Sequence, residues 1–498
     1  MPLYGRFEGV MLMKAIHTLA VDLGASNGRG IIGSFDGEKL TLSEVHRFKN
    51  AMILVNESSF WDILHLFNKT KTCIQKAWRE TGGKLSSAGI DGWAQDFGLL
   101  DSQGNLLGNV HTYRDPRWIG LEKELLCLMT REEYYDITGL LPGSSLSLFQ
   151  LVGMKKRERA CYEAADTFLF VPDLINYLLT GEKVCNITTA GLSGLYDIGR
   201  REWSRKVLNT AGLREIFPSF VGTHDIIGEI GKNAAEQMNI GKLHIVSVAA
   251  HDTMSALAFA PGRKNDALLL SSGTWSLYGH AIPEPISSPG VMRQKLFNEV
   301  GFDHEMFLIR NITGFWIVEE LFSEWGEAPD YERLNAAAME SVYRGYIDVD
   351  APEFAAPGRM EEKITGFLKK TGQKVPGRKE DFYLCVLLSL AMKYRQLKDA
   401  MELLGDRSFD CISIVGGGTK NTVLNTLTAD ICGKTVIAGP SEATAIGNIL
   451  CQLISLGEIR VEEATDLAAR SFETSEILSF HTDQWQEQYG QYLHIVSI

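Results

Sequence analysis

Apolar and polar positions near the N-terminus alternate in a pattern that predicts a strand meander. Three short segments, separated by turn residues, carry it: TLAVDLG (18–24), GRGIIGSF (28–35) and KLTLSEVHRF (39–48). Asn27 and Gly28 both tolerate positive φ, so we expect the first hairpin to turn at this dipeptide. An amphipathic helix over 61–82 and a buried strand over 85–93 follow. The beginning of the chain is therefore predicted to be α/β.

The middle of the chain is predicted to be helical. Three segments show helical periodicity: 122–139, 148–165 and 169–181. Gly139 and Gly181 are the expected helix ends. At the midpoint, DALLLSSGTWSLYGHAI (266–282) again places a strand, a small-residue turn and a strand in series. This arrangement is a weak echo of the opening segment.

The last part of the chain alternates between helix and strand. The expected order is helix, strand, helix, strand and helix over 380–405, 410–418, 421–433, 434–439 and 442–457. Such alternation implies parallel strands with crossover helices. Two α/β domains that each open with a strand-turn-strand unit predict a central cleft between them.

Composition favours a globular protein that binds small molecules. The chain has 498 residues, of which 45% are hydrophobic and 22% charged, and its formal net charge is −13 with scattered basic residues. This charge argues against a nucleic-acid or anionic-membrane surface. Eight cysteines are spread singly without a C-x-x-C pair, so we expect reduced core residues. The absence of a signal-peptide core and of an apolar run long enough for a membrane span predicts a cytoplasmic protein, for which Met11 or Met13 could be the start.

Asp22 ends the first predicted strand, directly before a turn of small residues. The spacing from Gly24 to Gly28 excludes a Walker A loop, and no helix follows as a dinucleotide fingerprint would require. A strand-end carboxylate beside free backbone N–H groups suits Mg²⁺ and nucleotide phosphates. The alternative is an aspartate that caps a hairpin.

Two later turns have similar character. SSGTWSLYG (271–279) offers hydroxyl and amide donors between apolar strands, although a plain turn is the more common meaning. In IVGGGTKN (414–421), three glycines between a strand and a helix allow a ligand to approach the backbone closely, so adenosine could lie on 416–418. A tight connection without a ligand is the alternative.

Polar residues inside small-residue runs indicate a substrate site. Asp252 lies in VAAHDTMSALA (248–258) and could accept a hydroxyl proton, but it would also serve as a helix N-cap. GIDGWAQDFGLLD and TYRDPR add aromatic, amide, carboxylate and guanidinium groups that suit sugar hydroxyls: Asp91, Trp93, Gln95, Asp96, Arg114, Asp115 and Arg117. GLLDSQGNLLG is equally an ordinary hairpin with Asp96 at its start.

Eight motifs occur in order along the chain: DLGASNGR, GIDGWAQDF, YRDPR, AAHDT, LSSGTWSL, RNITGFW, IVGGGTKN and AGPSEATAIGN. This ordered set resembles the FGGY carbohydrate kinases of the actin-like ATPase superfamily, from about Leu19 to the C-terminal region. The resemblance implies two actin-like (ribonuclease H-like) α/β domains facing a central cleft. It places sugar and phosphate binding in residues 14–257 and nucleotide binding in residues 258–498.

The resemblance also implies ATP and Mg²⁺ as cofactors, with Asp22 helping to organise the metal. The nucleotide-binding residues that it implies are Ala25, Ser26, Asn27, Gly28, Arg29, Thr274, Glu319, Gly417 and Gly418. The sugar-binding residues that it implies are Trp93, Ala94, Gln95, Asp96, His251, Asp252, Thr253 and Asn311. Asp252 would be the general base on a primary hydroxyl. Two residues depart from the family pattern: Ala94 replaces a glycine associated with sugar contact, and Glu319 replaces an expected glutamine, which removes two donors and adds a charge.

Within the family, the motifs are most similar to those of the branch that acts on L-rhamnulose. The implied function is ATP-dependent phosphorylation of a 6-deoxy-ketohexose at its C1 hydroxyl, with L-fuculose, L-ribulose and D-xylulose as alternative substrates. An ATP-switched binding protein of the actin or Hsp70 kind would not need AAHDT or GIDGWAQDF. A catalytically silent sugar sensor stays open, although Asp22 and Asp252 argue against it. We expect a monomer or a homodimer whose partner is a small sugar.

Overall fold

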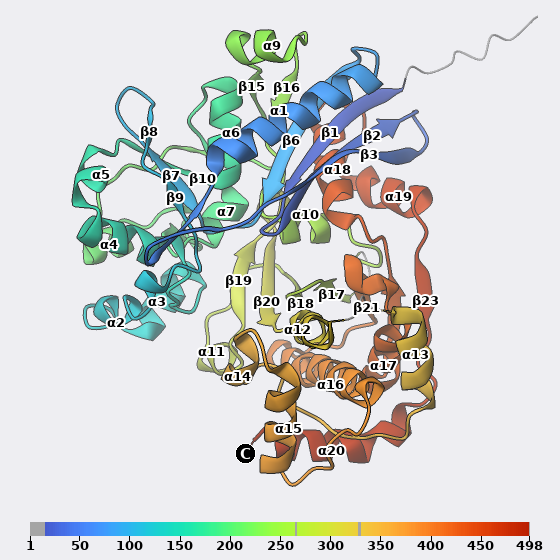
Figure 1. The fold of residues 1–498 in the computed structure, drawn as a ribbon. Helices are drawn as coiled ribbons and strands as arrows, with labels where there is room; N and C mark the ends of the chain where they lie inside the picture. The colour runs from blue at the N-terminus through green and yellow to red at the C-terminus, as the bar shows by residue number, and fades with distance from the viewer. Residues whose placement is uncertain (1–14, 264–265, 327–329, 498) are drawn as a thin grey trace, which may run out of the picture.

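Two mixed sheets organise the computed structural model, which describes residues 15–263, 266–326 and 330–497 (Figure 1). The alternative starts Met11 and Met13 lie outside these residues. The N-terminal sheet has the order β15-β16-β6-β1-β2-β3. Its strands are β1 (Ile16–Leu23), β2 (Asn27–Phe35), β3 (Leu40–Lys49), β6 (Leu85–Gly92), β15 (Ile226–Glu229) and β16 (His244–Val246).

The C-terminal sheet has the order β19-β20-β18-β17-β21-β22-β23. Its strands are β17 (Ala267–Ser272), β18 (Ser276–Ile282), β19 (Phe297–Val300), β20 (Met306–Ile312), β21 (Cys411–Val415), β22 (Thr435–Ala438) and β23 (Ser475–Ile477). Each sheet contains three antiparallel strands followed by two parallel ones, β3-β2-β1-β6-β16 in one and β20-β18-β17-β21-β22 in the other. The echo between the opening and the midpoint is thus confirmed as a repeated topology.

The first hairpin does not turn where the sequence predicts. Residues 24–26 make the turn, and Asn27 is already the first residue of β2. Neither Asn27 nor Gly28 has a positive φ. A Cβ on Gly28 would lie 2.3 Å from Cζ of Phe48, so this glycine serves close packing rather than a left-handed turn. The prediction of an Asn27-Gly28 hairpin dipeptide was therefore wrong, because a tertiary contact decides this position.

Helix α1 (Ile63–Glu80) covers one face of the N-terminal sheet (Figure 1). Asp62 caps it by accepting the N–H of His65 at 2.9 Å, as expected for an aspartate before an amphipathic run. The buried side chains recur every three or four residues along the helix: Ile63, Leu66, Thr70, Cys73, Ile74 and Ala77. This spacing confirms the amphipathic pattern over 61–82.

The middle region contains shorter elements than predicted. Its helices are α2 (Glu122–Leu125), α3 (Arg131–Thr138), α4 (Ser147–Arg157), α5 (Arg159–Ala164), α6 (Val171–Thr180), α7 (Ile187–Gly191), α8 (Arg205–Ala211) and α9 (Lys232–Met238). Gly139 and Gly181 are confirmed as left-handed caps of α3 and α6. Leu169 and Phe170 belong to strand β10 (Thr167–Phe170) instead of a helix, since β10 pairs with β7 (Phe97–Leu100). The smaller strands are β4 (Ile53–Val55), β5 (Ser58–Trp61), β8 (Leu106–Leu107), β9 (Val110–His111), β11 (Cys185–Asn186), β12 (Tyr196–Asp197), β13 (Glu202–Trp203) and β14 (Phe220–Val221).

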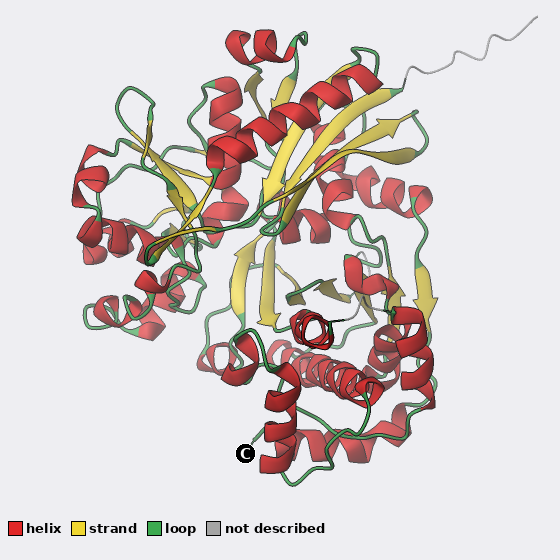
Figure 2. Ribbon diagram, viewed as in Figure 1, coloured by secondary structure: helices red, strands yellow, loops and turns green. Residues whose placement is uncertain are grey.

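Helices surround the C-terminal sheet and extend beyond it, as Figure 2 shows in red. They are α11 (Pro289–Arg293), α12 (Trp316–Trp325), α13 (Tyr331–Glu340), α14 (Pro352–Ala355), α15 (Met360–Lys370), α16 (Lys379–Gly405), α17 (Thr422–Cys432) and α20 (Gln486–Ile495). The predicted alternation after residue 380 is confirmed. Asn421 caps α17 through the N–H of Leu424, and Gly433 ends it with a positive φ.

Helices α18 (Ala443–Ser455) and α19 (Val461–Ser471) come late in the sequence but pack on the N-terminal sheet. Their apolar residues share a core with β1, β2 and β3, including Ala20, Ile31, Leu40, Ile446 and Ile449. α18 also crosses α10 (Asp252–Ala258), the helix at the junction of the two halves. These contacts join the two sheets into one body.

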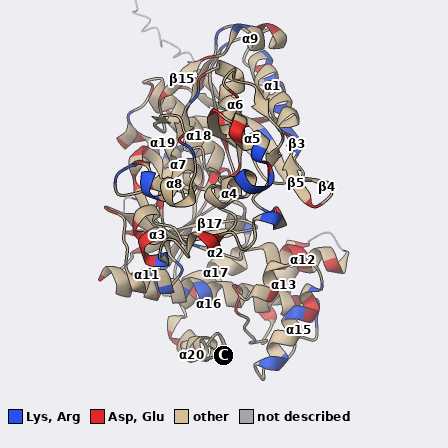
Figure 3. Cartoon of the chain, turned by 90° about the vertical axis from the view of Figure 1, so that its left-hand side faces the viewer, with Lys and Arg blue, Asp and Glu red and all other residues tan. Residues whose placement is uncertain are grey.

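Charged residues of both signs are mixed on the face that Figure 3 draws, and the cysteines are unpaired. Figure 3 shows Lys and Arg interspersed with Asp and Glu over the face in view. All eight cysteines are free, and six are buried, whereas Cys127 is exposed and Cys161 half-buried. The expectation that all are core residues was therefore wrong for these two. In the ranges that the structure describes, no helix is long and apolar enough to cross a membrane.

Candidate active site

Three aspartates meet at the carboxyl ends of neighbouring strands in the N-terminal sheet. Asp22 near the end of β1 lies directly opposite Asp91 near the end of β6 in the parallel register. The chain after β16 continues to His251, which forms a bridge with Gly92 and places Asp252 at the start of α10. Carboxyl ends of parallel strands are the usual ligand edge of an α/β sheet. The sequence had indicated Asp22 and Asp252 here by separate motifs, and the topology brings them together.

Burial raises the pKa values of two of these aspartates, because it disfavours their charged forms. Desolvation raises the pKa of Asp22 to about 6, with the charges of Asp252 and Glu442 adding to the effect and Arg29 opposing it. Burial also raises the pKa of Asp91 well above its usual range, and the charge of Asp22 contributes. Asn448 donates to Asp91 Oδ2 at 2.5 Å, while Asp91 Oδ1 has no partner among the described residues. The cluster therefore has more negative charge than its cations neutralise, and a bound cation would stabilise it.

The turn after Asp22 is held by Asn50. Its backbone N–H donates to Ser26 O at 3.0 Å and its side-chain amide donates to Gly24 O at 2.9 Å. Ser26 and Asn27 are left exposed on the turn, and Ala25 is half-buried. This geometry is compatible with the predicted role of residues 25–29 toward phosphates.

Arg29 connects the two halves of the chain. Its Nε donates to Asp22 Oδ2 at 3.1 Å, and its Nη1 donates to Glu442 Oε2 at 2.5 Å. Glu442 directly precedes α18. The guanidinium therefore lies between a strand-end carboxylate and a carboxylate from the opposite end of the sequence, ready to exchange one of them for a phosphate.

His251, Asp252 and Thr253 form a connected group. The N–H of Thr253 donates to Asp252 Oδ1 at 2.6 Å, and His251 Nε2 lies 3.4 Å from the same oxygen. His251 Nδ1 is 2.5 Å from Glu299 Oε1 on β19. Burial lowers the pKa of His251, but the Glu299 carboxylate outweighs it, so the net shift is upward. The N-cap position of α10 is His251 rather than Asp252, which is the first helical residue with its side chain partly exposed.

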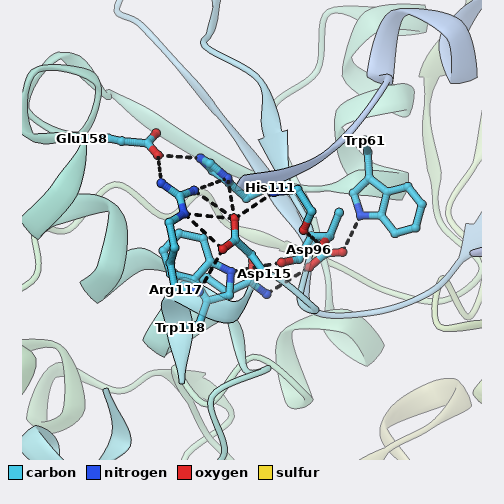
Figure 4. A network of polar contacts seen from close by, with 10 residues as sticks. Trp61, Asp96, His111, Asp115, Arg117, Trp118 and Glu158 are labelled. Carbon is cyan, nitrogen blue, oxygen red and sulfur yellow. Dashed lines mark hydrogen bonds and ion pairs between the residues drawn. The ribbon is translucent and has the colours of Figure 1, made fainter. Parts of the chain in front are cut away.

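The segment GWAQDF forms a rigid loop after β6. Asp96 is fully buried and accepts from Trp61 Nε1 at 2.6 Å, Trp93 Nε1 at 2.9 Å and Gln150 Nε2 at 2.9 Å. Burial nevertheless raises the pKa of Asp96 to about 7. Figure 4 shows Trp61 pointing at this carboxylate. With three donors on its carboxylate, Asp96 fixes the loop; its contact with a sugar stays a prediction.

Gln95 has a left-handed backbone with φ of 83°. Its carbonyl oxygen accepts from Ser147 Oγ at 2.6 Å and from Gln150 Nε2 at 3.3 Å, which holds this costly conformation. The side chain lines the cavity described below. Non-glycine residues in such a conformation often lie at functional sites, so the strain supports the predicted role of Gln95 toward the sugar.

Gln95→Gly and Gln95→Ala separate backbone strain from recognition. Both variants lose the side-chain amide, so we expect the KM for the sugar to rise about tenfold in each, equivalent to about 1.4 kcal/mol. Only Ala retains the strained φ, so Gln95→Ala should unfold at a lower temperature than Gln95→Gly. Steady-state kinetics and thermal unfolding check the two effects, and an unchanged KM in both variants would contradict sugar contact by the amide.

The YRDPR motif builds a structural network next to this loop (Figure 4). Arg117 donates to Asp115 and Glu158, and His111 Nε2 lies 2.8 Å from Glu158 Oε1. Ser59 N–H also donates to Asp115 Oδ2, which ties the network to β5. Asp115 and Arg117 therefore engage protein partners, whereas Arg114 is exposed and contacts Tyr113.

The C-terminal sheet directs two small-residue turns toward the junction. Ser271 on β17 is paired with Val415 on β21, so residues 272–274 and 416–418 leave adjacent strand ends. A Cβ on Gly418 would lie 2.0 Å from Ser272 Oγ, while one on Gly417 would meet nothing within 4 Å. Close packing thus explains Gly418, and Gly417 is the open position that a nucleotide could approach.

Thr274 and Glu319 are hydrogen-bonded to each other. Thr274 Oγ1 donates to Glu319 Oε1 at 3.0 Å, and burial raises the pKa of Glu319. The pair lies between the turn after β17 and the first turn of α12. Glu319 therefore contacts a residue predicted to lie along the nucleotide rather than only facing solvent.

A cavity of about 380 Å³ lies between the halves. Leucines and an aromatic ring form its apolar wall: Leu140, Leu141, Leu146, Leu192 and Phe297. Polar side chains that line it include Gln95, Arg310, Asn311 and Asp350, and the exposed Trp275 also faces it. Among the predicted site residues, the cavity includes Gln95 and Asn311 but not Asp22, Asp252 or Thr274.

Two segments connect the cavity to the aspartate cluster. Gly92 pairs with His251, and Gln95 follows it by three residues. Phe297 of β19 lines the cavity, and Glu299 of the same strand contacts His251. Because residues two apart on a strand share one face, both side chains lie on the same side of β19. The sequence motifs did not include Glu299, whose only signal is one carboxylate in the short buried strand FNEV. Glu442 lay within a quoted motif without a predicted role.

The repeated topology defines the actin-like class of ATPase fold, and comparisons with known proteins specify it. The FGGY carbohydrate kinase models match over residues 17–258 for the N-terminal domain and 268–456 for the C-terminal domain. The chain belongs to the FGGY family of carbohydrate kinases. It is therefore an enzyme that uses ATP to phosphorylate a small sugar.

Curated relatives share much of the sequence. A rhamnulokinase of Bacteroides thetaiotaomicron is 36% identical over 450 residues, covering 90% of this chain and 92% of the relative. A rhamnulokinase of Oceanobacillus iheyensis is 34% identical and covers 91% and 97%. The xylulose kinase structure from Rhodospirillum rubrum has a TM-score of 0.80 at 17% identity, covering 97% of this chain and 98% of that one. This last likeness concerns the fold.

Proposed function

We propose that this kinase transfers the γ-phosphoryl group of ATP to the C1 hydroxyl of L-rhamnulose, a 6-deoxy-ketohexose. The observation that carries the proposal is the cluster of strand-end aspartates, connected through residues 92–95 and β19 to a cavity with amides and an apolar wall. The rhamnulokinase relatives support the choice of sugar. An apolar wall suits a ligand that ends in a methyl group, and the Gln95 and Asn311 amides suit its hydroxyls.

Asp252 is the proposed general base. Its partly exposed carboxylate accepts the proton of the C1 hydroxyl as the oxygen forms its bond to the γ-phosphorus. The bond between that phosphorus and the bridging oxygen breaks, and ADP leaves. Phosphoryl transfer depends mainly on positioning and charge stabilisation, which Arg29 and the backbone of residues 25–28 would supply to the phosphates.

The residues present fit a magnesium ion. The unbalanced negative charge around Asp22 and the unpartnered Asp91 Oδ1 favour a cation, and Mg²⁺ prefers oxygen ligands. Within the part of the chain that the structure describes, no group of three His, Cys, Asp or Glu side chains could hold a metal alone. Asp22 would therefore hold Mg²⁺ together with nucleotide phosphates and water. The ion would neutralise charge on the phosphates during transfer.

The remaining assignments belong to the same proposal. Residues 14–257 would bind sugar and phosphates and residues 258–498 the nucleotide, with Thr274, Glu319, Gly417 and Gly418 along it. His251, Thr253, Asn311 and the segment from Trp93 to Asp96 would surround the sugar. The free cysteines support a reducing compartment such as the cytoplasm, where ATP is available.

A panel of ketoses tests the choice of substrate. ADP release with Mg-ATP is measured for L-rhamnulose, L-fuculose, L-ribulose, D-xylulose, glycerol and L-fructose. L-fructose is the matched control because it differs from L-rhamnulose only by the hydroxyl at C6. We expect kcat/KM to be at least a hundredfold higher for L-rhamnulose than for the other deoxyketose or the pentuloses, which is about 2.7 kcal/mol of discrimination.

L-fructose should fall below L-rhamnulose because its extra hydroxyl loses water against the apolar wall without gaining a partner. A preference for another ketose would preserve the kinase assignment and contradict the proposed sugar. Equal rates for L-fructose and L-rhamnulose would contradict the methyl contact.

A further inference from the structure

Glu299 is a fully buried carboxylate that the reaction scheme above does not use. It lies on β19, an edge strand of the C-terminal sheet, with no solvent-exposed surface. Its Oε1 is 2.5 Å from His251 Nδ1, and its Oε2 has no hydrogen-bond partner among the described residues. A buried carboxylate is costly unless it is paired, so the contact with His251 explains how this position is tolerated.

The imidazole connects Glu299 to the proposed base. Its Nε2 lies 3.4 Å from Asp252 Oδ1, so the order along the group is Glu299, His251 and Asp252. The backbone N–H of His251 donates to Thr188 Oγ1 on α7, and β19 packs against α7. Figure 1 shows β19 extending from the lower half toward α7 and α10. The backbone of His251 is therefore held by the N-terminal half of the chain and its ring by Glu299 of the C-terminal half.

We infer that Glu299 is a positioning residue for phosphoryl transfer: it holds His251 as an imidazolium whose Nε2–H points at Asp252 and the sugar. The inference rests on the proposed role of Asp252. Nδ1–H is donated to Glu299, which leaves only Nε2 for the sugar side. Nε2 lies 3.4 Å from Asp252 Oδ1, so the imidazole orients this carboxylate toward the sugar hydroxyl.

The charged groups that face His251 are Glu299 from β19 and Asp252 from α10; Thr188 from α7 is neutral. The Glu299 carboxylate accounts for the upward shift of the His251 pKa against the effect of burial. Removing its charge should lower the pKa of the His251 imidazole. Activity that needs the imidazolium is present below the His251 pKa and is lost as the pH rises through it.

The test is Glu299→Gln, which keeps the shape and the hydrogen-bond acceptor but removes the charge. We expect kcat near pH 7.5 to fall about 10- to 100-fold and the alkaline limb of the kcat profile to move down by at least one pH unit. Glu305→Gln is the matched control, since Glu305 is partly exposed and pairs with Arg263. The pH profile of kcat for Glu305→Gln should equal that of the wild-type enzyme. A fall in kcat without movement of the limb would indicate a structural role and would overturn the inference.

One measurement does not need the Glu299→Gln variant, and another tests whether Glu299 acts through His251. NMR titration of the His251 imidazole in the unchanged enzyme should give a pKa above 6.5, and a value below 6.5 overturns the inference without any assay. In a His251→Gln background, Glu299→Gln should cause no further loss of kcat, and an additive loss would mean that Glu299 does not act through His251. The titration does not depend on turnover, so failure of the sugar-kinase proposal remains distinguishable.

Discussion

Asp252→Asn should lower kcat for the sugar by about 10² to 10⁴, the range that a positioned general base contributes. The amide cannot accept the hydroxyl proton, while the fold around it should persist because Asn Oδ1 can still accept the N–H of Thr253. The nucleotide should bind with unchanged affinity, since its proposed contacts lie in residues 25–29, Thr274, Glu319 and residues 417–418. Steady-state kinetics and nucleotide titration by calorimetry measure the two quantities separately.

Asp406→Asn is the control for this substitution. Asp406 is an exposed residue in the left-handed C-cap of α16, a conformation that asparagine also adopts. Its kcat should equal that of the unchanged enzyme. Near-normal turnover in Asp252→Asn would remove Asp252 from the role of base.

Gly447→Ala should destabilise the whole protein by about 1–3 kcal/mol or more. Gly447 lies where α18 crosses α10, and a Cβ there would be 1.9 Å from the backbone oxygen of Ser255. A backbone atom cannot rotate away, so the two helices must separate. The next residue, Asn448, donates to Asp91 and to Gly89 O, so kcat should fall as well. Urea unfolding measures the loss as a lower midpoint.

Gly366→Ala is the matched control, for which we expect no loss of stability. Gly366 lies inside α15, and a Cβ there would meet nothing within 4 Å. Alanine is the better helix former by about 1 kcal/mol, so this variant should be slightly more stable than the unchanged enzyme. If Gly447→Ala were equally stable, the close approach of α10 and α18 would not constrain the fold.

Local patterns were sufficient for the strand meanders, the late helix-strand alternation and the glycine caps of α3 and α6. Each depends on neighbours in sequence, such as the buried i, i+3 and i+4 positions of α1. The prediction of a turn at Asn27-Gly28 was wrong because the conformation there depends on Phe48, which packs against Gly28. A dipeptide preference is weak beside a tertiary contact of this kind.

The contacts in the site that the sequence did not reveal are between residues far apart in the sequence. Arg29 and Glu442 are 413 residues apart, and Asn448 and Asp91 are 357 residues apart. Glu299 contacts His251 across 48 residues. Motifs could indicate Asp22 and Asp252 because a carboxylate at the end of a buried strand or at the start of a small-residue helix has a recognisable setting. Pairing between distant segments has no local pattern.

The packing of α18 and α19 on the first sheet has a consequence for how the protein is made. The ribosome synthesises β1, β2 and β3 roughly 400 residues before α18. At about 5–20 residues per second, the face of the sheet that α18 covers stays exposed for about 20 to 80 s. Until then, Ala20, Ile31 and Leu40 lack the Ile446 and Ile449 side chains that bury them in the finished enzyme. Nascent chains that stall before residue 443 should therefore recruit chaperones or be degraded, and an N-terminal half produced alone should aggregate.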